Sequence, residues 1–169
     1  MVPIISVVGV SKADRTRLVE KLVAELGKRD YRVATVKRDA HCYDLDTPGK
    51  ASWRHSQAGA QTVVVSSSAR ITMFKQVEKE WTLDELTGKF FFDADIVITD
   101  GYTNENKPKV KVLTAIAEDD IRIPESELVS VVALNPDELT EQDKIPKFSL
   151  EEIDKLADLI EARFLKEEL

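Results

Sequence analysis

The residues of this chain that could do chemistry begin with the octapeptide GVSKADRT, residues 9–16, which follows the apolar run PIISVV. A phosphate-binding P-loop has the pattern G-x-x-x-x-G-K-[ST], in which backbone N–H groups and the lysine hold phosphate and the hydroxyl ligates magnesium. The octapeptide keeps Gly9 and Thr16 but has Asp14 and Arg15 where the pattern has glycine and lysine. The residues therefore predict either a weak phosphate site or the remains of one.

Two interpretations of this octapeptide stay open. In the first, Ser11, Lys12, Arg15 and the backbone still bind an anion at a helix start, where the helix dipole favours negative charge. In the second, Ser11 and Asp14 form a capping box and the segment is an ordinary helix start. A carboxylate about 4 Å from a phosphate costs on the order of 4 kcal/mol at an effective dielectric near 20, which is roughly a thousandfold in affinity. Neither interpretation supports efficient hydrolysis.

A second candidate is the carboxylate of Asp100, which ends the apolar stretch DIVITD and precedes Gly101. Ligands of α/β proteins bind at the carboxyl edge of the parallel strands, and this carboxylate is expected there. Thr16 and Asp100 are therefore predicted to hold Mg²⁺, which prefers oxygen ligands. The alternative is that Asp100 and Gly101 only begin a turn.

A third candidate is the polar segment KRDAHCYDLDTPGK, residues 37–50, which mixes cations, carboxylates and one imidazole. Its Lys37, His41, Asp46 and Lys50 are candidate contacts to phosphate or metal. One histidine among scattered aspartates is not a zinc pattern, so the residues alone favour a solvated loop.

These side chains need an α/β framework to position them. Residues 3–8 are apolar without alternation, as in a strand buried on both faces of a parallel sheet. Apolar residues at helical spacing over 18–26 predict a helix that closes at Gly27, and 31–36 predict a second strand. The remaining expected elements are helices at 51–60 and 82–86, a hairpin from 61–66 and 70–74, strands at 94–100, 109–116 and 128–134, and a closing helix capped by Ser149 and Glu152. We find no internal repeat, and predict a single domain over residues 1–169.

Composition narrows the classes of function. The formal net charge of -7 and the sequence pI near 5.0 argue against general binding to nucleic acid, which needs clustered Lys and Arg. No apolar segment has transmembrane length, so we expect no membrane association and a cytoplasmic protein. The single cysteine, Cys42, excludes an internal disulfide.

The run from Lys37 to Ser67, KRDAHCYDLDTPGKASWRHSQAGAQTVVVSS, resembles the corresponding segment of the molybdopterin-guanine dinucleotide biosynthesis adapter proteins, the MobB family. The opening strand and loop also fit, as does DIVITDGY at residues 95–102, which is similar to the family's carboxylate-glycine-aromatic motif. The resemblance covers Pro3 to about Thr114 and weakens toward the C-terminus.

This resemblance implies a P-loop NTPase-like three-layer fold with a mostly parallel sheet and a β-hairpin extension. It also implies a homodimer that binds GTP with Mg²⁺ and assists the molybdenum cofactor guanylyltransferase, which attaches GMP to molybdopterin. The chain departs from the family pattern mainly where chemistry would take place, at Asp14, Arg15, Cys42, Ala51 and Asp100.

These departures favour an adapter with a weakened nucleotide site over an enzyme. The first alternative is a slow Mg-dependent GTPase in which Thr16 and Asp100 hold the metal and Arg15 replaces the lysine. The second is a scaffold without nucleotide that binds molybdopterin or a protein partner.

Overall fold

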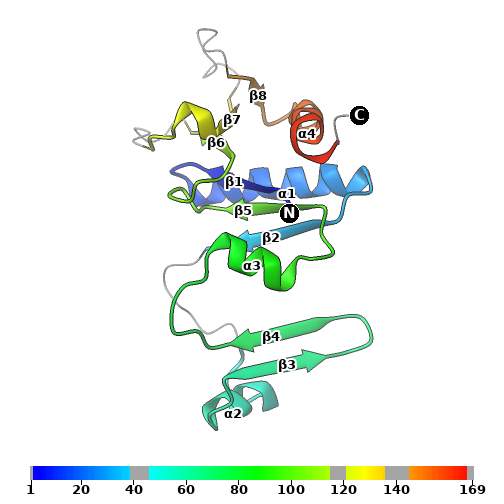
Figure 1. Cartoon of the computed structure of the whole chain (residues 1–169), viewed down its shortest axis with the longest axis vertical. Coiled ribbons are helices and arrows are strands. Elements are labelled where there is room, and N and C mark those ends of the chain that lie inside the picture. Colours follow the sequence, from blue (N-terminus) through cyan, green and yellow to red (C-terminus); the bar gives the residue numbers. More distant parts are fainter. Residues whose placement is uncertain (1, 39–45, 115–120, 136–144, 167–169) are drawn as a thin grey trace. The chain divides into compact units, whose positions relative to one another are not determined.

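The computed structural model describes residues 2–38, 46–114, 121–135 and 145–166. The chain divides into two compact units (Figure 1): unit 1 comprises Met1–Arg38 and Leu83–Leu169, and unit 2 comprises Asp39–Thr82. The sequence did not indicate this division, and the single domain over residues 1–169 stays a prediction.

Unit 1 is built on a six-stranded sheet in which every pair of neighbours is parallel. The strand order is β2-β5-β1-β6-β7-β8, so β1 and β5 lie inside the sheet, and all five residues of each are buried. The predicted α/β class and mostly parallel sheet are therefore confirmed. The strands are β1 (Ile4–Val8), β2 (Val33–Lys37), β5 (Ile96–Asp100), β6 (Lys109–Leu113), β7 (Leu128–Ala133) and β8 (Lys147–Ser149).

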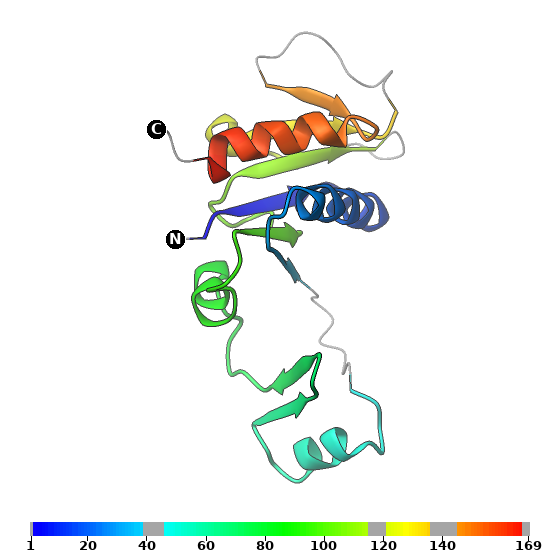
Figure 2. The ribbon, with the colours of Figure 1, turned by 90° about the vertical axis from the view of Figure 1, so that its right-hand side faces the viewer.

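Helices cover both faces of this sheet. The first hydrophobic cluster joins Ile5 and Val7 to α1 (Lys12–Lys28) and α4 (Ile153–Ile160), which lie side by side (Figures 1 and 2). The second cluster joins Ile4 to α3 (Leu83–Phe90). Because successive strand residues point to opposite faces, these two clusters define three layers.

The ends of the helices show how far local signals predict structure. Helix α1 continues through Gly27 to Lys28, and the left-handed residue is Asp30, with φ 65. The Asp30 N–H donates to the Gly27 carbonyl at 3.1 Å. The prediction that the helix closes at Gly27 is therefore wrong, because that position still has helical geometry. A π-helical turn, Glu161–Leu165, follows α4.

Unit 2 consists of α2 (Ala51–Gln57) and an antiparallel hairpin of β3 (Thr62–Ser66) and β4 (Ile71–Lys75). The hairpin was predicted and is confirmed. Its turn is closed by Ser67, whose N–H donates to the Arg70 carbonyl at 2.9 Å and whose hydroxyl oxygen accepts from the Arg70 N–H at 3.0 Å.

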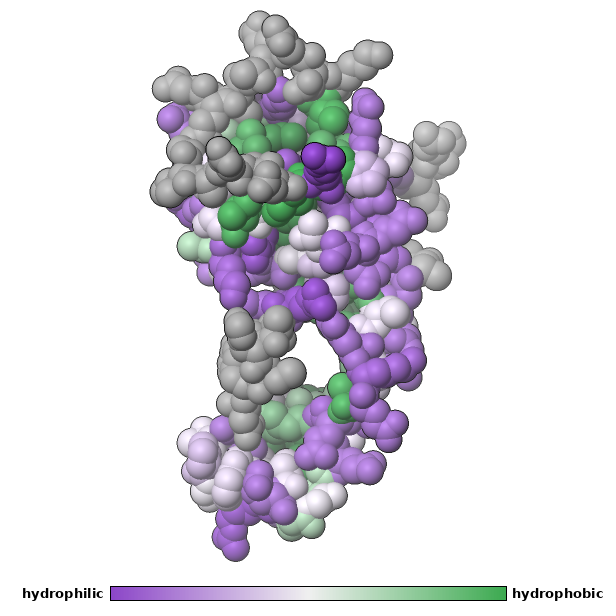
Figure 3. Space-filling model, turned by 90° about the vertical axis from the view of Figure 1, so that its left-hand side faces the viewer, coloured by the Kyte–Doolittle hydropathy of each residue, from purple (hydrophilic) through white to green (hydrophobic). Residues whose placement is uncertain are grey.

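The described surface is largely hydrophilic on the face drawn in Figure 3. Its large exposed apolar side chains are mostly in unit 2, where Ile71 is 72% exposed and Val64 is 54% exposed. Among the helices of the described ranges, none combines the length and apolar character needed to span a membrane.

Candidate functional site

The start of α1 has the geometry of a capped helix. The Ser11 hydroxyl oxygen accepts from the Asp14 N–H at 3.2 Å, and the Ser11 carbonyl accepts from the Arg15 N–H at 3.2 Å. The helix therefore begins at Lys12, only three residues after Gly9. The N–H groups of Asp14 and Arg15, which a phosphate-binding loop would point at its ligand, therefore donate to Ser11 within the first turn of the helix. The reciprocal bond from the Asp14 carboxylate stays a prediction.

Gly9 is required for packing as well as for any loop chemistry. A Cβ atom at this position would lie 2.8 Å from the Val112 carbonyl oxygen of β6 and 3.2 Å from the Val112 Cβ. The glycine of the octapeptide therefore has a structural reason to be present, and it is not by itself a sign of phosphate binding.

Asp100 lies at the carboxyl end of β5, next to the start of α1, as predicted. The Arg15 Nε is 3.1 Å from Asp100 Oδ1, and the Thr16 hydroxyl donates to Asp100 Oδ2 at 2.8 Å. The Lys37 ammonium at the end of β2 is 3.6 Å from Oδ2. Asp100 is 8% exposed, and these three donors occupy both of its oxygens. The sequence predicted that Asp100 and Thr16 would lie together, but not that Arg15 or Lys37 would contact Asp100.

The guanidinium of Arg15 also closes the loop beneath it. Its Nη1 donates to the Gly9 carbonyl oxygen, so the side chain bridges from the loop to the end of β5. The Arg15 side chain is 15% exposed. The positive charge of Arg15 is therefore held by the Gly9 carbonyl and the Asp100 carboxylate.

The residues around Asp100 do not fit a magnesium ion as they stand. A divalent cation would have to displace Arg15 from Oδ1 while Lys37 remains near Oδ2. A dication about 4 Å from one guanidinium meets a repulsion on the order of 8 kcal/mol at an effective dielectric near 20. Across the described ranges, moreover, no three His, Cys, Asp or Glu side chains come together in a way that could hold a metal ion.

The turn after Asp100 depends on backbone geometry. Gly101 has φ 102, and its N–H donates to the Val7 carbonyl at 2.9 Å. The Thr99 hydroxyl donates to the Gly101 carbonyl at 3.1 Å. The carboxylate therefore has its predicted place at the sheet edge, while the turn itself follows later, where the Glu105 N–H donates to the Tyr102 carbonyl at 3.3 Å.

The other predicted site residues are in unit 2 or outside the described residues. His41 is outside the described residues, and Asp46 and Lys50 belong to unit 2. Asp46 Oδ1 accepts from the Thr47 N–H at 2.8 Å and from the Ser52 hydroxyl at 3.1 Å, which holds the chain entering α2. Lys50 is the N-cap residue of α2.

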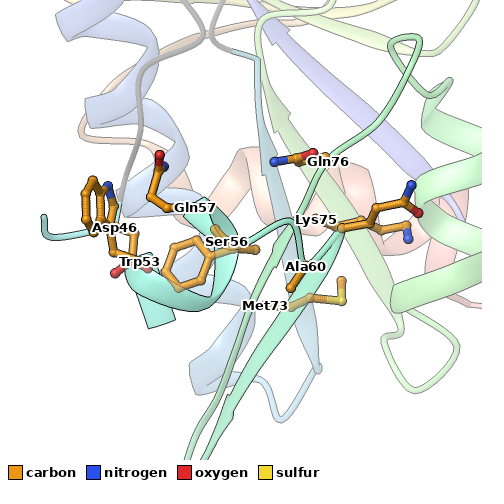
Figure 4. Close-up of a pocket in the computed structure, with 10 residues that line it drawn as sticks. Asp46, Trp53, Ser56, Gln57, Ala60, Met73, Lys75 and Gln76 are labelled. Carbon is orange, nitrogen blue, oxygen red and sulfur yellow. The ribbon is translucent and has the colours of Figure 1, made fainter. Parts of the chain in front are cut away.

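Unit 2 contains a second candidate site that the residues alone did not predict (Figure 4). This pocket of about 380 Å³ lies between α2 and β4, and its lining includes Asp46, Trp53, Gln57, Phe74 and Gln76. The β4 residues of this lining carried no signal of their own in the sequence. The antiparallel register places Phe74 opposite Val63, which is buried.

Comparisons with known proteins agree on one family. The family profile described as "Molybdopterin guanine dinucleotide synthesis protein B" matches residues 4–135. The molybdopterin-guanine dinucleotide biosynthesis adapter protein of Haemophilus influenzae is 33% identical over 110 residues, which are 64% of this chain and 62% of that protein. Its Escherichia coli counterpart is 28% identical over 113 residues, 65% of each chain. The match thus spans somewhat less than two thirds of each relative.

Solved structures show the same fold over nearly the whole chain. A crystal structure of molybdopterin-guanine biosynthesis protein B superimposes with a TM-score of 0.73 at 25% identity, covering 96% of this chain and 99% of that one. Bacillus subtilis MobB gives a TM-score of 0.71 at 18% identity, with 98% and 99% covered.

Proposed function

Because the chain belongs to the molybdopterin guanine dinucleotide synthesis protein B family, we propose that it is an adapter protein in the biosynthesis of molybdopterin guanine dinucleotide. The relatives from H. influenzae and E. coli carry that adapter name, which supports the assignment. A homodimer, a molybdenum cofactor guanylyltransferase as partner and a cytoplasmic location belong to the same proposal.

The second part of the proposal is that residues 9–16 handle nucleotide weakly. The pairing of Arg15 with Asp100 is the observation that carries this part. An incoming phosphate would have to pull Arg15 from Asp100 and would then lie near the Asp14 carboxylate in the first turn of α1. Breaking the Arg15–Asp100 ion pair and the repulsion from Asp14 both lower the affinity for phosphate. GTP binding is therefore expected to be weak and turnover negligible.

A slow Mg-dependent GTPase is the competing function. The 2.8 Å hydrogen bond between Thr16 and Asp100 favours it, because these are the two residues such an enzyme would use around its metal. The position of Arg15 argues against it, since the guanidinium already compensates the carboxylate. A scaffold that binds molybdopterin or a protein without nucleotide is consistent with the same closed loop.

The adapter role is tested in a host strain whose own protein of this family has been deleted. Expression of this chain is expected to raise the cellular content of molybdopterin guanine dinucleotide, measured by mass spectrometry of the extracted cofactor. Thr16→Val should restore that content as well as the unaltered chain, because the adapter role does not depend on nucleotide turnover. A content that stays at the level of the empty strain would contradict the adapter assignment, and a specific loss with Thr16→Val would favour the GTPase.

A further inference from the structure

One side of helix α2 faces the pocket of unit 2, and the other side is exposed. Trp53 and Ser56 are the residues of the first side, and Figure 4 shows both at the pocket. The residues of the other side, together with the N-cap residue before them, are all exposed and recur at spacings of three and four residues. We call this set the basic face of α2, and its members are Lys50, Ala51, Arg54, His55 and Ala58.

The basic face lies in a stretch of the chain that has no acidic residue. Residues 47–77 contain four Lys and Arg residues and no Asp or Glu, so all 31 acidic residues of the chain lie outside this stretch. Within the ranges that the structure describes, Lys50, Arg54 and His55 form no ion pair with a carboxylate. Exposed positive charge is therefore left without compensation on this helix, in a chain whose net charge is -7.

The stability of α2 does not account for all of this charge. Arg54 and His55 lie in the last turn, where the helix dipole favours cations, but Lys50 is the N-cap residue, where the dipole disfavours a cation. The Lys50 side chain makes no capping hydrogen bond, and the first turn has no acidic residue. Lys50 and Arg54 are four residues apart, which places two like charges side by side on the helix. An interaction outside the helix is therefore the better explanation of this arrangement.

A closed C-terminal end holds this short helix in place. The Gly59 N–H donates to the Ser56 carbonyl at 3.0 Å, and the Ala60 N–H donates to the His55 carbonyl at 3.2 Å. Gly59 has φ 103, so the helix ends in a Schellman motif with a left-handed glycine. Seven residues alone make a marginal helix in water, so this closure fixes the basic face in one conformation. A surface that is already ordered loses less conformational entropy when a partner binds.

The shape and composition of the basic face select the class of partner. The outer side of a helix is convex, whereas small molecules bind in concave sites, so the partner is a macromolecule. A membrane-binding helix would need large apolar side chains, but the apolar residues of this face are Ala51 and Ala58. Nucleic acid would be repelled by a chain whose net charge is -7. A protein surface that carries Asp or Glu complements the basic face.

We propose that the basic face of α2 docks an acidic segment of a partner protein, whose carboxylates pair with Lys50 and Arg54. The proposal rests on the proposed function, because an adapter acts by binding another protein, and the guanylyltransferase named there is the partner to test. The four-residue spacing of the two cations matches carboxylates that lie one helical turn apart on the partner. Exposed charge pairs of this kind raise the rate of association and fix the orientation of the partner.

Biolayer interferometry with the purified guanylyltransferase of the deletion-strain host tests the docking. The full chain is immobilised, and the enzyme is the soluble analyte. We expect saturable binding that weakens at least tenfold between 50 mM and 500 mM NaCl, because salt screens exposed charges. Single-stranded oligothymidine and phosphatidylserine vesicles are the competing probes. No binding of the enzyme, or tighter binding of either competing probe, would overturn the proposal.

Charge reversal locates the binding on α2. Lys50→Glu combined with Arg54→Glu should weaken binding of the enzyme at least tenfold, mainly through slower association. Lys50→Gln combined with Arg54→Gln removes the charge at the same exposed positions and should give a smaller loss. The matched control is Arg17→Glu combined with Lys28→Glu, which changes the net charge equally on exposed residues of α1 and should leave binding unchanged. An equal loss in the control, or unchanged binding in either α2 variant with a native circular dichroism spectrum, would contradict the proposal.

The deletion strain separates this docking from the adapter role. The charge-reversed α2 variant is expected to restore less dinucleotide content than the unaltered chain, whereas the α1 control should restore it fully. If the α2 variant bound the enzyme and restored the content as well as the unaltered chain, the docking surface alone would be wrong. If the unaltered chain bound the enzyme through α2 but restored no content, the adapter role alone would be wrong.

Discussion

The guanidinium of Arg15 is the side chain that holds residues 9–16 in their observed form. It lies against Asp100 and the Gly9 carbonyl, while the Ser11 hydroxyl caps the helix. Arginine does this better than lysine because its planar fork reaches two acceptors at once. The same interaction engages the carboxylate that a metal ion would need, so this one side chain bears on both parts of the proposed weak nucleotide site.

The double substitution Asp14→Gly with Arg15→Lys is expected to strengthen GTP binding at least tenfold. Glycine removes a negative charge worth on the order of 4 kcal/mol against a phosphate about 4 Å away, and lysine releases the fork that bridges Gly9 and Asp100. Isothermal titration with GTP in the presence of Mg²⁺ measures the gain.

Arg17→Lys is the matched control for this titration, since Arg17 is an exposed residue of the same helix and should leave affinity unchanged. A folded double variant that gains nothing would point to the scaffold without nucleotide. Micromolar, Mg-dependent binding by the unaltered chain would contradict the weak site.

Among the secondary-structure elements, α4 is preceded by a turn that side-chain hydrogen bonds stabilise. The Glu152 carboxylate accepts from the Ser149 N–H at 3.0 Å and from the Ser149 hydroxyl at 3.2 Å, and the Lys155 ammonium donates to it at 2.7 Å. The bond from Lys155, followed by those from Ser149, lowers the pKa of Glu152 from 4.5 to about 2. Ser149 and Glu152 are thus paired, but Ser149 is the last residue of β8 and the N-cap residue of α4 is Glu152, so the prediction that Ser149 caps this helix is wrong.

This pKa shift predicts a pH-dependent contribution to stability. A lowered folded-state pKa means that the stabilisation is fully present above pH 4.5 and is lost as the pH falls toward 2. The difference in Tm between the unaltered chain and Glu152→Gln should therefore be largest near neutral pH and should shrink below pH 4.5. Thermal unfolding followed by circular dichroism from pH 7 to pH 2 measures it.

Glu151→Gln is the neighbouring control, because that side chain is 81% exposed and should give only a small difference in Tm. If the Glu152→Gln difference grew as the pH fell, the sign of this linkage would be wrong.

The elements that the sequence predicted well are those with a strong apolar pattern. The buried strands β1 and β5, the helix α1 and the hairpin follow from runs and periodicities that local physics dictates. By contrast, β8 has three residues and exists because β7 offers it a parallel edge. Helix α3 runs to Phe90, four residues beyond the predicted end, because the apolar side that carries Leu83 packs against the sheet. Such features depend on tertiary neighbours that no local window contains.

The same distinction applies to the candidate sites. Parallel strands end at one edge, so the sequence predicted that Asp100 would lie near Thr16. The sequence could not predict that Arg15 binds Asp100 or that Phe74 lies opposite Val63. Both depend on how the strands and the helix come together in the folded chain. The division into two units was also missed, because the residues that flank Asp39–Thr82 show no linker composition.

For the molecule as a whole, the division into two units predicts that unit 1 is stable without unit 2. Every residue of both hydrophobic clusters belongs to unit 1, so its core is complete without residues 39–82. Replacing these residues by a flexible Gly-Ser linker should leave a cooperative transition with a Tm within about 5 °C of the full chain. The shortened protein contains no tryptophan, so far-UV circular dichroism follows its unfolding.

The control for this deletion removes α3 instead. Leu83 is fully buried in the second cluster, and its loss with the helix should abolish the cooperative transition or lower the Tm far more. If removal of residues 39–82 were equally damaging, unit 2 would have to contribute to the stability of unit 1. If only the removal of α3 is damaging, unit 1 folds without unit 2, and changes in α2 or the hairpin leave undisturbed the sheet that holds Arg15 and Asp100.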